Sequence, residues 1–221
     1  MFQLYGALGA ASLAPQCVLE EAGLPYELVE VDIAENSERD PEYLKLNPHG
    51  RIPTLASGNQ ALIESVAIFC IYLADKHPGV GPSPPLDHPD RPHYLQWMVY
   101  LTNTLQETLL LKLYSVEYAD DSQGQPGVIS RVAAKLDMIM AFINRSLGEA
   151  DGPFSLGSQL STADIHLNIL VGWGPAIYVR VLAVSAQPAE ISGQQYSKLE
   201  SNSVAMLQHP AIARTFAANH Y

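Results

Sequence analysis

Apolar and polar positions alternate in two short segments near the start of the chain and recur at helical spacing between them. The alternation predicts a strand over residues 2–6 (FQLYG) and a second, largely β-branched strand over 26–33 (YELVEVDI). The intervening LAPQCVLEEAG has apolar residues three and four positions apart, which predicts an amphipathic helix that ends at Gly23.

The next apolar segments are shorter and are separated by turn residues. Asp40-Pro41 predicts the start of a short helix that reaches Leu46. Over residues 47–69 (NPHGRIPTLASGNQALIESVAIF) we expect a turn, two strands joined by a hairpin at SGNQ, and a helix with Ser65 as its N-cap. The order strand, helix, strand, helix, strand, strand, helix predicts a mixed four-stranded sheet with a right-handed crossover.

A proline-rich connector separates this pattern from a purely helical one. Six prolines fall within residues 78–92, which is typical of a stiff boundary between domains. We therefore expect an α/β domain over 1–78, a linker over 79–89 and an all-α domain over 90–221.

Several helical segments are recognisable in the second part of the chain. Apolar spacing predicts a long helix capped by Asp90 that extends to Ala119, and a second one over 128–147 that ends at Gly148. Ser161 with Asp164 resembles a capping box at the start of the third, which Trp173-Gly174-Pro175 is expected to interrupt. Two short helices separated at His209-Pro210 follow.

Composition excludes several classes of function. The net charge of −11 disfavours nucleic acid and anionic membranes as partners, because both require basic patches. No run approaches the roughly 18 apolar residues of a membrane span, and the first residues lack a signal-peptide pattern, so we expect a cytoplasmic protein. Cys17 and Cys70 lie in apolar helical patterns and are expected to be buried thiols, and no histidine pair has metal-ligand spacing.

The candidate binding chemistry lies between residues 47 and 69. Pro53 opens a strand whose edge can pair with an extended peptide, and a helix N-terminus that can bind a carboxylate begins a few residues later at Ser65. The sequence therefore predicts a site for a small anionic peptide.

Five segments in this order resemble the cytosolic glutathione transferases, and the bacterial beta-type group most. They are LYGALGAASLAPQCVLEEAGLPYELVEVDI, NPHGRIPTL, IESVAI, the proline-rich connector and FSLGSQLSTADIHL. The resemblance implies a thioredoxin-like N-terminal domain, an all-α C-terminal domain, glutathione as co-substrate, no metal and a homodimer.

The resemblance also implies the residues that bind glutathione. The bond before Pro53 is expected to be cis, and the backbone of Ile52 is expected to pair with the cysteinyl unit. Ser65 and the helix start would bind the γ-glutamyl carboxylate, and Glu64 the ammonium. Arg51 is a candidate partner of the glycyl carboxylate; its alternative is a solvated surface position.

The position that activates the thiol differs from the beta-type pattern. Those proteins carry a cysteine in GACS, whereas this chain reads Gly9-Ala10-Ala11-Ser12. Ala11 cannot form a mixed disulfide, and Cys17 lies about 7.5 Å further along the helix. Ser12 is the hydroxyl in the right place to stabilise a thiolate, with Tyr5 and a backbone N–H as the alternatives.

Candidates in the helical domain are Asn103 and Gln106, where Gln106 replaces a beta-type histidine, and Tyr114 and Trp173 for a hydrophobic co-substrate pocket. For the last two, packing in the helical core is the alternative. The expected activity is attack of the glutathione thiol on a small hydrophobic electrophile. The alternatives are a related peroxidase or lyase, and a glutathione-binding or ligand-storage protein with little turnover.

Overall fold

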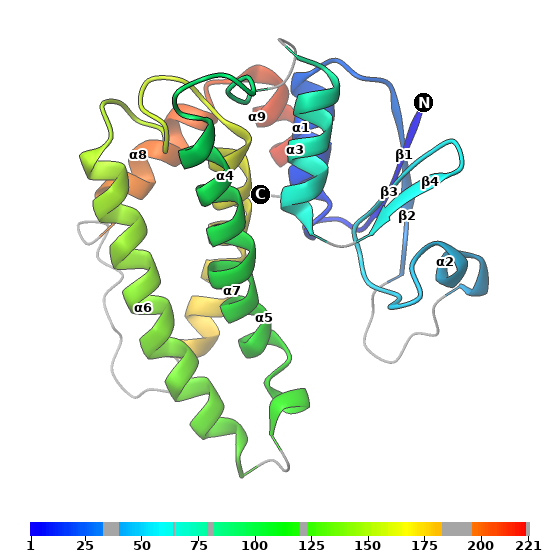
Figure 1. Ribbon diagram of the computed structural model, residues 1–221. Coiled ribbons are helices and arrows are strands. Elements are labelled where there is room, and N and C mark those ends of the chain that lie inside the picture. The colour runs from blue at the N-terminus through cyan, green and yellow to red at the C-terminus, as the bar shows by residue number, and fades with distance from the viewer. Residues whose placement is uncertain (33–39, 64, 79–81, 120–122, 183–195, 220–221) are drawn as a thin grey trace. The chain divides into compact units, whose positions relative to one another are not determined.

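The computed structural model describes residues 1–32, 40–63, 65–78, 82–119, 123–182 and 196–219, with side chains described outside 174–182. The chain forms two compact units (Figure 1). The first comprises Met1–Arg91 and Leu207–Tyr221, and the second comprises Pro92–Met206.

The first unit is built on the predicted mixed four-stranded sheet. Its strands are β1 (Phe2–Gly6), β2 (Tyr26–Glu30), β3 (Thr54–Ser57) and β4 (Gln60–Ile63). The spatial order is β2-β1-β3-β4, with β1 parallel to β2, and β3 antiparallel to both β1 and β4. The fold class predicted for this domain is confirmed; β2 is shorter than predicted and ends at Glu30.

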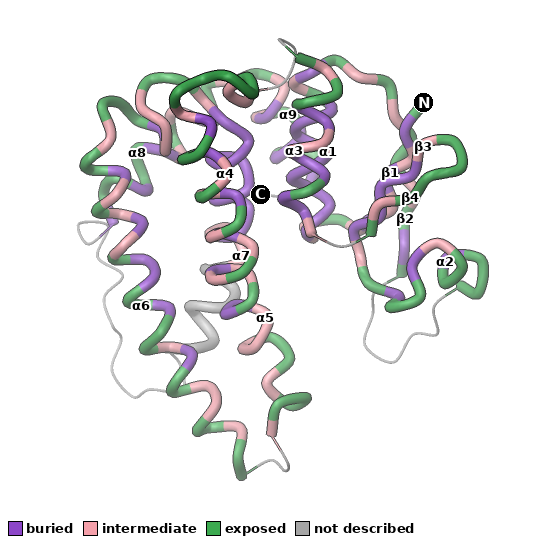
Figure 2. Tube along the Cα trace, viewed as in Figure 1, coloured by how far each residue is buried: buried purple, intermediate pink, exposed green. Residues whose placement is uncertain are grey.

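Helices cover this sheet and supply most of its apolar core. They are α1 (Leu13–Glu21), α2 (Pro41–Leu46), α3 (Val66–Lys76) and α9 (Pro210–Ala218). Leu4 of β1, Leu13 of α1 and Phe69 of α3 are fully buried. Figure 2 shows buried positions along the adjoining α1 and α3, and α1 contacts both α3 and α9.

The C-terminal helix belongs to the first unit. The sequence placed everything from residue 90 onward in the helical domain, whereas the compact units assign Leu207–Tyr221 to the α/β part. The physical reason is that α9 packs on α1, where Ile212 and Phe216 are buried.

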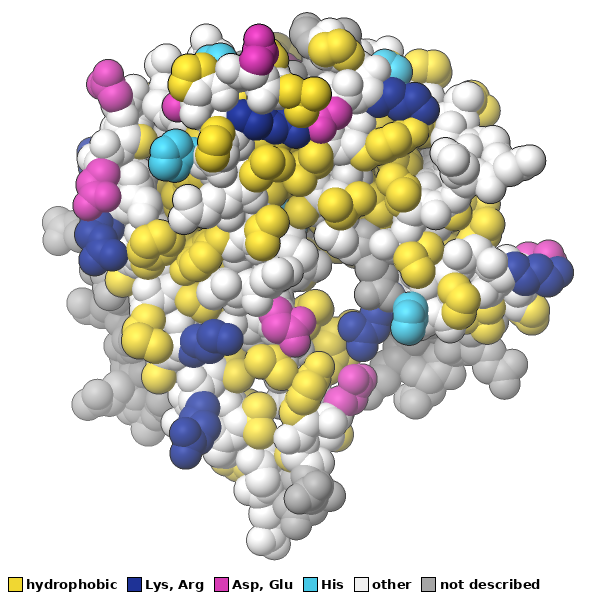
Figure 3. Space-filling view, in the orientation of Figure 1, with side chains coloured by type: hydrophobic (Ala, Val, Ile, Leu, Met, Phe, Trp, Pro, Cys, Tyr) yellow, Lys and Arg dark blue, Asp and Glu magenta, His cyan; other side chains and the backbone are white. Residues whose placement is uncertain are grey.

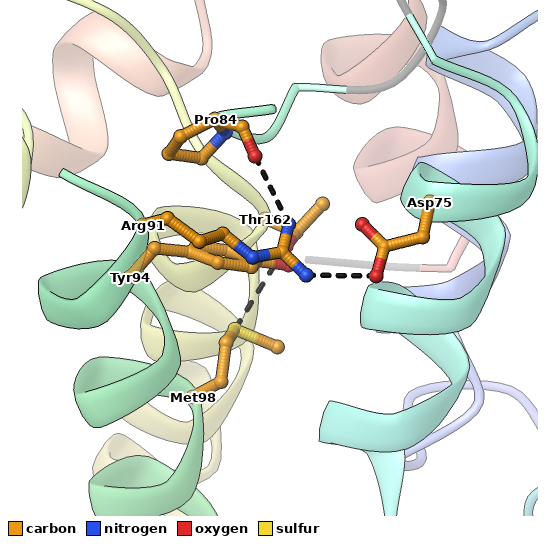
Figure 4. A network of polar contacts seen from close by, with 6 residues as sticks. All are labelled: Asp75, Pro84, Arg91, Tyr94, Met98 and Thr162. Carbon is orange, nitrogen blue, oxygen red and sulfur yellow. Dashed lines mark hydrogen bonds and ion pairs between the residues drawn. The ribbon is translucent and has the colours of Figure 1, made fainter. Parts of the chain in front are cut away.

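Arg91 ties the proline-rich connector to α3. Its Nη1 donates to the Pro84 carbonyl at 2.9 Å, and its Nη2 is 2.7 Å from the Asp75 carboxylate (Figure 4). Arg91 is 6% exposed, so the ion pair is shielded on the arginine side. Residues 79–81 of the predicted linker lie outside the described residues.

The second unit is helical, as predicted. Its elements are α4 (Arg91–Tyr100, which begins one residue before the unit), a π-helix (Leu101–Gln106), α5 (Glu107–Leu113), a 3₁₀ turn (Ser115–Tyr118), α6 (Gln125–Glu149), α7 (Thr162–Leu182) and α8 (Ser197–Met206).

Three predicted boundaries in this unit are wrong. The first long helix contains the π segment and ends as an α-helix at Leu113. α6 passes Gly148, since an isolated glycine lowers helix propensity without ending a helix. α7 continues through Trp173-Gly174-Pro175, because one proline removes a single backbone donor.

Asp164 organises the start of α7. One carboxylate oxygen accepts from the Ser161 N–H at 2.9 Å and the Ser161 hydroxyl at 2.8 Å. The other accepts from Ser155 N–H at 2.7 Å and Asn202 Nδ2 at 2.9 Å. The predicted carboxylate half of the capping box is confirmed. Burial raises the pKa of Asp164, and these four hydrogen bonds oppose the rise.

Further side-chain contacts join α7 to the first long helix. The Tyr94 and Thr162 hydroxyls lie 2.6 Å apart, and Thr162 contacts the Met98 sulfur (Figure 4). His166 is 1% exposed, its Nε2 lies 3.3 Å from the Thr102 hydroxyl, and burial lowers its pKa to about 3.

His166 is expected to make the second unit sensitive to acid. Its folded-state pKa of about 3 lies below the unfolded value of about 6.5, so the unfolded state binds more protons between these pH values. Stability is therefore lost as the pH falls below about 6.5. His166→Gln should remove this contribution. As the pH falls from 7 to 5, the wild type should therefore lose free energy of unfolding relative to the variant, by up to about 1.4 kcal/mol per pH unit.

Urea unfolding at pH 7, 6 and 5 measures this difference. The exposed Gln96 of α4 provides the control, because Gln96→Ala changes no titratable group and its difference from wild type should stay constant with pH. A constant difference for His166→Gln as well would contradict the prediction.

Candidate functional site

The register of the sheet brings three separate segments to one end of the first unit. Tyr5 of β1 pairs with Thr54 of β3, and Thr54 pairs with Ile63 of β4. Three segments therefore meet at the same end of the sheet: the loop that follows β1, the residues that precede β3 and the residues that follow β4. These segments carry the predicted residues Ser12, Arg51 to Pro53, and Ser65.

The segment before β3 is held by two side chains that bind one carbonyl group. The Arg51 carbonyl accepts from the Tyr43 hydroxyl at 2.5 Å and from Asn47 Nδ2 at 2.8 Å. The Ile52–Pro53 peptide bond is cis, Ile52 is half-buried and Pro53 is buried. The Arg51 side chain is exposed.

Asn47 also shapes the turn that leads into this segment. Its Oδ1 accepts from the His49 N–H at 3.1 Å, and its carbonyl accepts from the Gly50 N–H at 2.9 Å. Gly50 has φ +63°, a conformation that glycine adopts at little cost. Asn47 is fully buried, so its amide group is committed to this turn and to the Arg51 carbonyl.

The backbone of Ile52 is available to a ligand. Among the described residues, neither its N–H nor its carbonyl has a hydrogen-bond partner, although the Arg51 carbonyl before it has two. A free N–H and C=O on an otherwise fixed backbone can pair with one residue of an extended peptide.

Ser65 lies at the start of α3 in a strained conformation. Its φ of +41° and ψ of +79° are unusual for a residue other than glycine, at a cost of about 1–3 kcal/mol. Ser65 was predicted to cap α3, but its hydroxyl makes no capping hydrogen bond. The N–H groups of Val66 and Ala67 have no acceptor among the described residues, which leaves an anion-binding helix end. The predicted partner Glu64 lies outside the described residues.

The loop before α1 is closed by Ser12. The Ser12 hydroxyl donates to the Ala7 carbonyl at 3.1 Å and accepts from the Ala7 N–H at 3.3 Å, and the residue is 2% exposed. A Cβ on Gly6 would lie 2.3 Å from the Ser12 side chain, so this close packing requires glycine at position 6. The hydroxyl donates to the Ala7 carbonyl, whereas the sequence suggested this hydroxyl as the donor to a thiolate.

The other groups near this loop have distinct environments. The half-buried Tyr5 ring packs against Tyr43, with 5.5 Å between ring centroids. Cys17 and Cys70 are fully buried, and burial raises the pKa of both thiols. Buried thiols of this kind are poor nucleophiles.

Asn103 and Gln106 lie on the first long helix of the second unit, Tyr114 directly follows that helix, and Trp173 lies on α7. Asn103 and Gln106 belong to the π-helix, a rare element that often marks functional positions. Asn103 is exposed, and the Gln106 Oε1 is buried with no partner among the described residues. Tyr114 is 46% exposed, and Trp173 is half-buried.

Other site types find no support in the described part of the chain. No group of three or more His, Cys, Asp or Glu residues there is arranged to hold a metal ion. No described helix is long and apolar enough to cross a membrane. Lys and Arg side chains are scattered over the face shown in Figure 3 rather than gathered into a basic patch.

Sequence reasoning missed Tyr43 and Asn47 as site residues. The sequence places Asn47 in an expected turn and Tyr43 in an expected short helix. Both residues donate to a backbone carbonyl, and no pattern of side chains in the sequence predicts such a contact. The one available signal was an asparagine a few residues before Ile52-Pro53.

Known proteins share this architecture. Residues 1–75 match the family model of the glutathione S-transferase N-terminal domain. The uncharacterized GST-like protein YncG of Escherichia coli (strain K12) is 27% identical over 176 residues, covering 79% of this chain and 83% of that protein.

Two solved structures extend the similarity to the whole chain. A ternary complex of BphK, a bacterial GST, aligns with a TM-score of 0.80 and 26% identity over 99% of this chain and all of that one. A glutathione transferase homologue from Sulfitobacter with bound glutathione aligns with a TM-score of 0.82 and 25% identity over 99% of this chain and 98% of that one.

Replacing Asn47 should destabilise the first unit. Asn47→Ala leaves the buried turn without its Oδ1 acceptor and removes one donor to the Arg51 carbonyl. The free energy of unfolding should fall by about 1–3 kcal/mol, the cost of leaving such groups unsatisfied. Asn59→Ala, at an exposed hairpin position, should change it by less than about 0.5 kcal/mol in the same urea titration. Equal effects of the two changes would argue against this role for Asn47.

Proposed function

We propose that the chain is a member of the cytosolic glutathione transferase family and that it binds glutathione where the loop before α1, the Ile52–Pro53 segment and the start of α3 meet at one end of the sheet. The bound thiol would then attack a small hydrophobic electrophile. The free backbone of Ile52, beside an Arg51 carbonyl that is already bound by Tyr43 and Asn47, carries this proposal.

Each part of glutathione has a counterpart in this region. The cysteinyl unit would pair with the Ile52 N–H and C=O as a short antiparallel strand. The γ-glutamyl carboxylate would accept from the Ser65 hydroxyl and the first N–H groups of α3, with Glu64 binding the ammonium. The exposed Arg51 guanidinium would bind the glycyl carboxylate.

The strain at Ser65 supports this assignment. Ser65 has φ +41°, and its hydroxyl makes no capping hydrogen bond. The hydroxyl therefore contributes nothing to the stability of the helix. Backbone strain of this kind persists where the surrounding structure enforces it, and it gathers at ligand sites. Here the Ser65 hydroxyl makes no capping bond, and the Val66 and Ala67 N–H groups have no acceptor among the described residues at this helix end.

Activation of the thiol is the more demanding step. Lowering a thiol pKa of about 8.5 by two units requires about 2.7 kcal/mol of preferential stabilisation of the thiolate. One charge-assisted hydrogen bond supplies about 1.5–3 kcal/mol, and a helix N-terminus adds up to about 1 kcal/mol. Because the Ser12 hydroxyl is bonded to Ala7, we assign the donor role to the Ala11 and Ser12 N–H groups, which have no acceptor among the described residues.

The second unit would supply the hydrophobic co-substrate pocket. Tyr114 and Trp173 are the proposed lining residues, and Gln106, with Asn103 beside it, is the proposed polar contact. The family resemblance extends the proposal to a cytoplasmic homodimer. A second candidate function is a glutathione-binding protein with little turnover, favoured by the engaged Ser12 hydroxyl and by alanine at position 11.

Glutathione binding tests the first part of the proposal. Isothermal titration calorimetry should detect binding to the wild type, and Ser65→Ala should weaken the affinity about tenfold or more, because a charge-assisted hydrogen bond is lost. Tyr5→Phe provides the control and should change the affinity less than about twofold. Absence of binding, or a larger loss for Tyr5→Phe than for Ser65→Ala, would overturn the site assignment.

The pKa of the bound thiol distinguishes the transferase from the binding protein. Thiolate absorbance as a function of pH should give a value lowered by about two units in the wild type. Ser12→Ala should raise it by less than about one unit, because the donors proposed here are backbone groups. A rise of two units would make the Ser12 hydroxyl the donor, and an unshifted wild-type value would leave the binding protein as the function.

A further inference from the structure

The C-terminal helix α9 contacts the candidate thiol loop directly. α9 packs along α1 within the first unit, and a polar contact fastens it at each end. At its start, His209 Nδ1 lies 3.2 Å from the Glu21 carboxylate. At its end, Asn219 lies against the loop formed by residues 7–12.

Asn219 uses both ends of its side-chain amide. Its Nδ2 donates to the Thr215 carbonyl at 2.9 Å and to Gln16 Oε1 at 3.3 Å. Its Oδ1 accepts from the Gly9 N–H at 3.4 Å. Asn219 is 6% exposed, so water competes little for these bonds.

The neighbours of Asn219 determine which way its amide points. Gln16 Nε2 donates to the Tyr26 hydroxyl at 3.1 Å, and that hydroxyl donates to Glu20 at 2.7 Å. Burial and the bond to Glu20 raise the pKa of Tyr26 to about 12, so the hydroxyl keeps its hydrogen at neutral pH. Gln16 therefore presents only Oε1 to Asn219, which places Asn219 Nδ2 toward Gln16 and Oδ1 toward Gly9.

Short-range hydrogen bonds also hold the loop itself. Ala10 N–H donates to the Ala7 carbonyl at 3.2 Å, and Leu13 N–H donates to the Ala10 carbonyl at 3.1 Å. Ser12 and Ala7 close the loop across five residues. Gly9 lies at the middle with φ +67°, and its bond to Asn219 spans 210 residues of chain.

We propose that Asn219 is a positioning residue for the thiol site: by binding the Gly9 N–H, it fixes the loop that orients the Ala11 and Ser12 N–H groups. This inference rests on the proposed function, because it assigns those groups the thiolate. Asn219 itself touches the loop and not the thiol. Through Asn219 the C-terminal helix would thus contribute to the thiol site as well as to the packing of the α/β unit.

The test compares changes at the two ends of α9. Asn219→Ala removes the bond to Gly9, and His209→Ala removes the contact with Glu21 at the opposite end of the helix. Asn219→Ala should raise the bound-thiol pKa by about half to one unit and lower kcat about three- to tenfold with KM nearly unchanged, the range that one neutral hydrogen bond supplies. His209→Ala should lower the melting temperature and leave the thiol pKa at the wild-type value.

Amide exchange tests the contact without reference to catalysis. The Gly9 N–H should exchange slowly in the wild type and in Asn219→Asp, which retains an acceptor for Gly9. It should exchange faster in Asn219→Ala. Because Asn219→Asp keeps the acceptor, it also tests the inference should the alanine variant fail to fold.

Two results would overturn the inference alone: an unshifted thiol pKa in Asn219→Ala, or the same shift in Asn219→Ala and His209→Ala. In either case the wild type would still bind glutathione with a lowered thiol pKa, and the proposed function would stand. A wild type that leaves the thiol pKa unshifted would remove the proposed thiolate chemistry and this inference with it.

Discussion

The candidate site depends on the register between β1, β3 and β4. Pairing of Tyr5 with Thr54, and of Thr54 with Ile63, places a loop, a cis-proline segment and a helix start at one end of the sheet. A shift of one residue would turn every side chain of a strand to the other face and expose buried residues such as Leu4 and Leu55. The burial of the core therefore holds the site together.

Within that frame, polar side chains act mainly on backbone groups. Tyr43 and Asn47 bind the Arg51 carbonyl, Ser12 binds Ala7, and Asn219 binds Gly9. Most polar side chains in proteins bond to backbone or water rather than to each other, and here those bonds decide which backbone groups remain for a ligand. The site is accordingly defined as much by its unused N–H and C=O groups as by its side chains.

Some predictions succeeded because they rested on local physics. The alternation in residues 2–6 and the hairpin residues at 57–60 gave strands close to those observed, and the Asp164 capping contact followed from its spacing to Ser161. Others failed because a single residue type only biases a helix boundary. Gly148 did not end α6, and the Ser65 hydroxyl does not cap α3.

The sequence by itself determined the mixed sheet, the proline-rich boundary, the helical second part and the resemblance that located Ile52, Pro53 and Ser65. These features follow from periodicity, from turn chemistry and from motifs contained in short stretches of chain. Only the tertiary structure decided that the Ser12 hydroxyl faces Ala7, that Tyr43 and Asn47 share the Arg51 carbonyl, and that Asn219 reaches the loop before α1. The physical reason is that a hydrogen bond depends on the final positions of both partners, and residues far apart in sequence carry no local pattern that reveals their pairing.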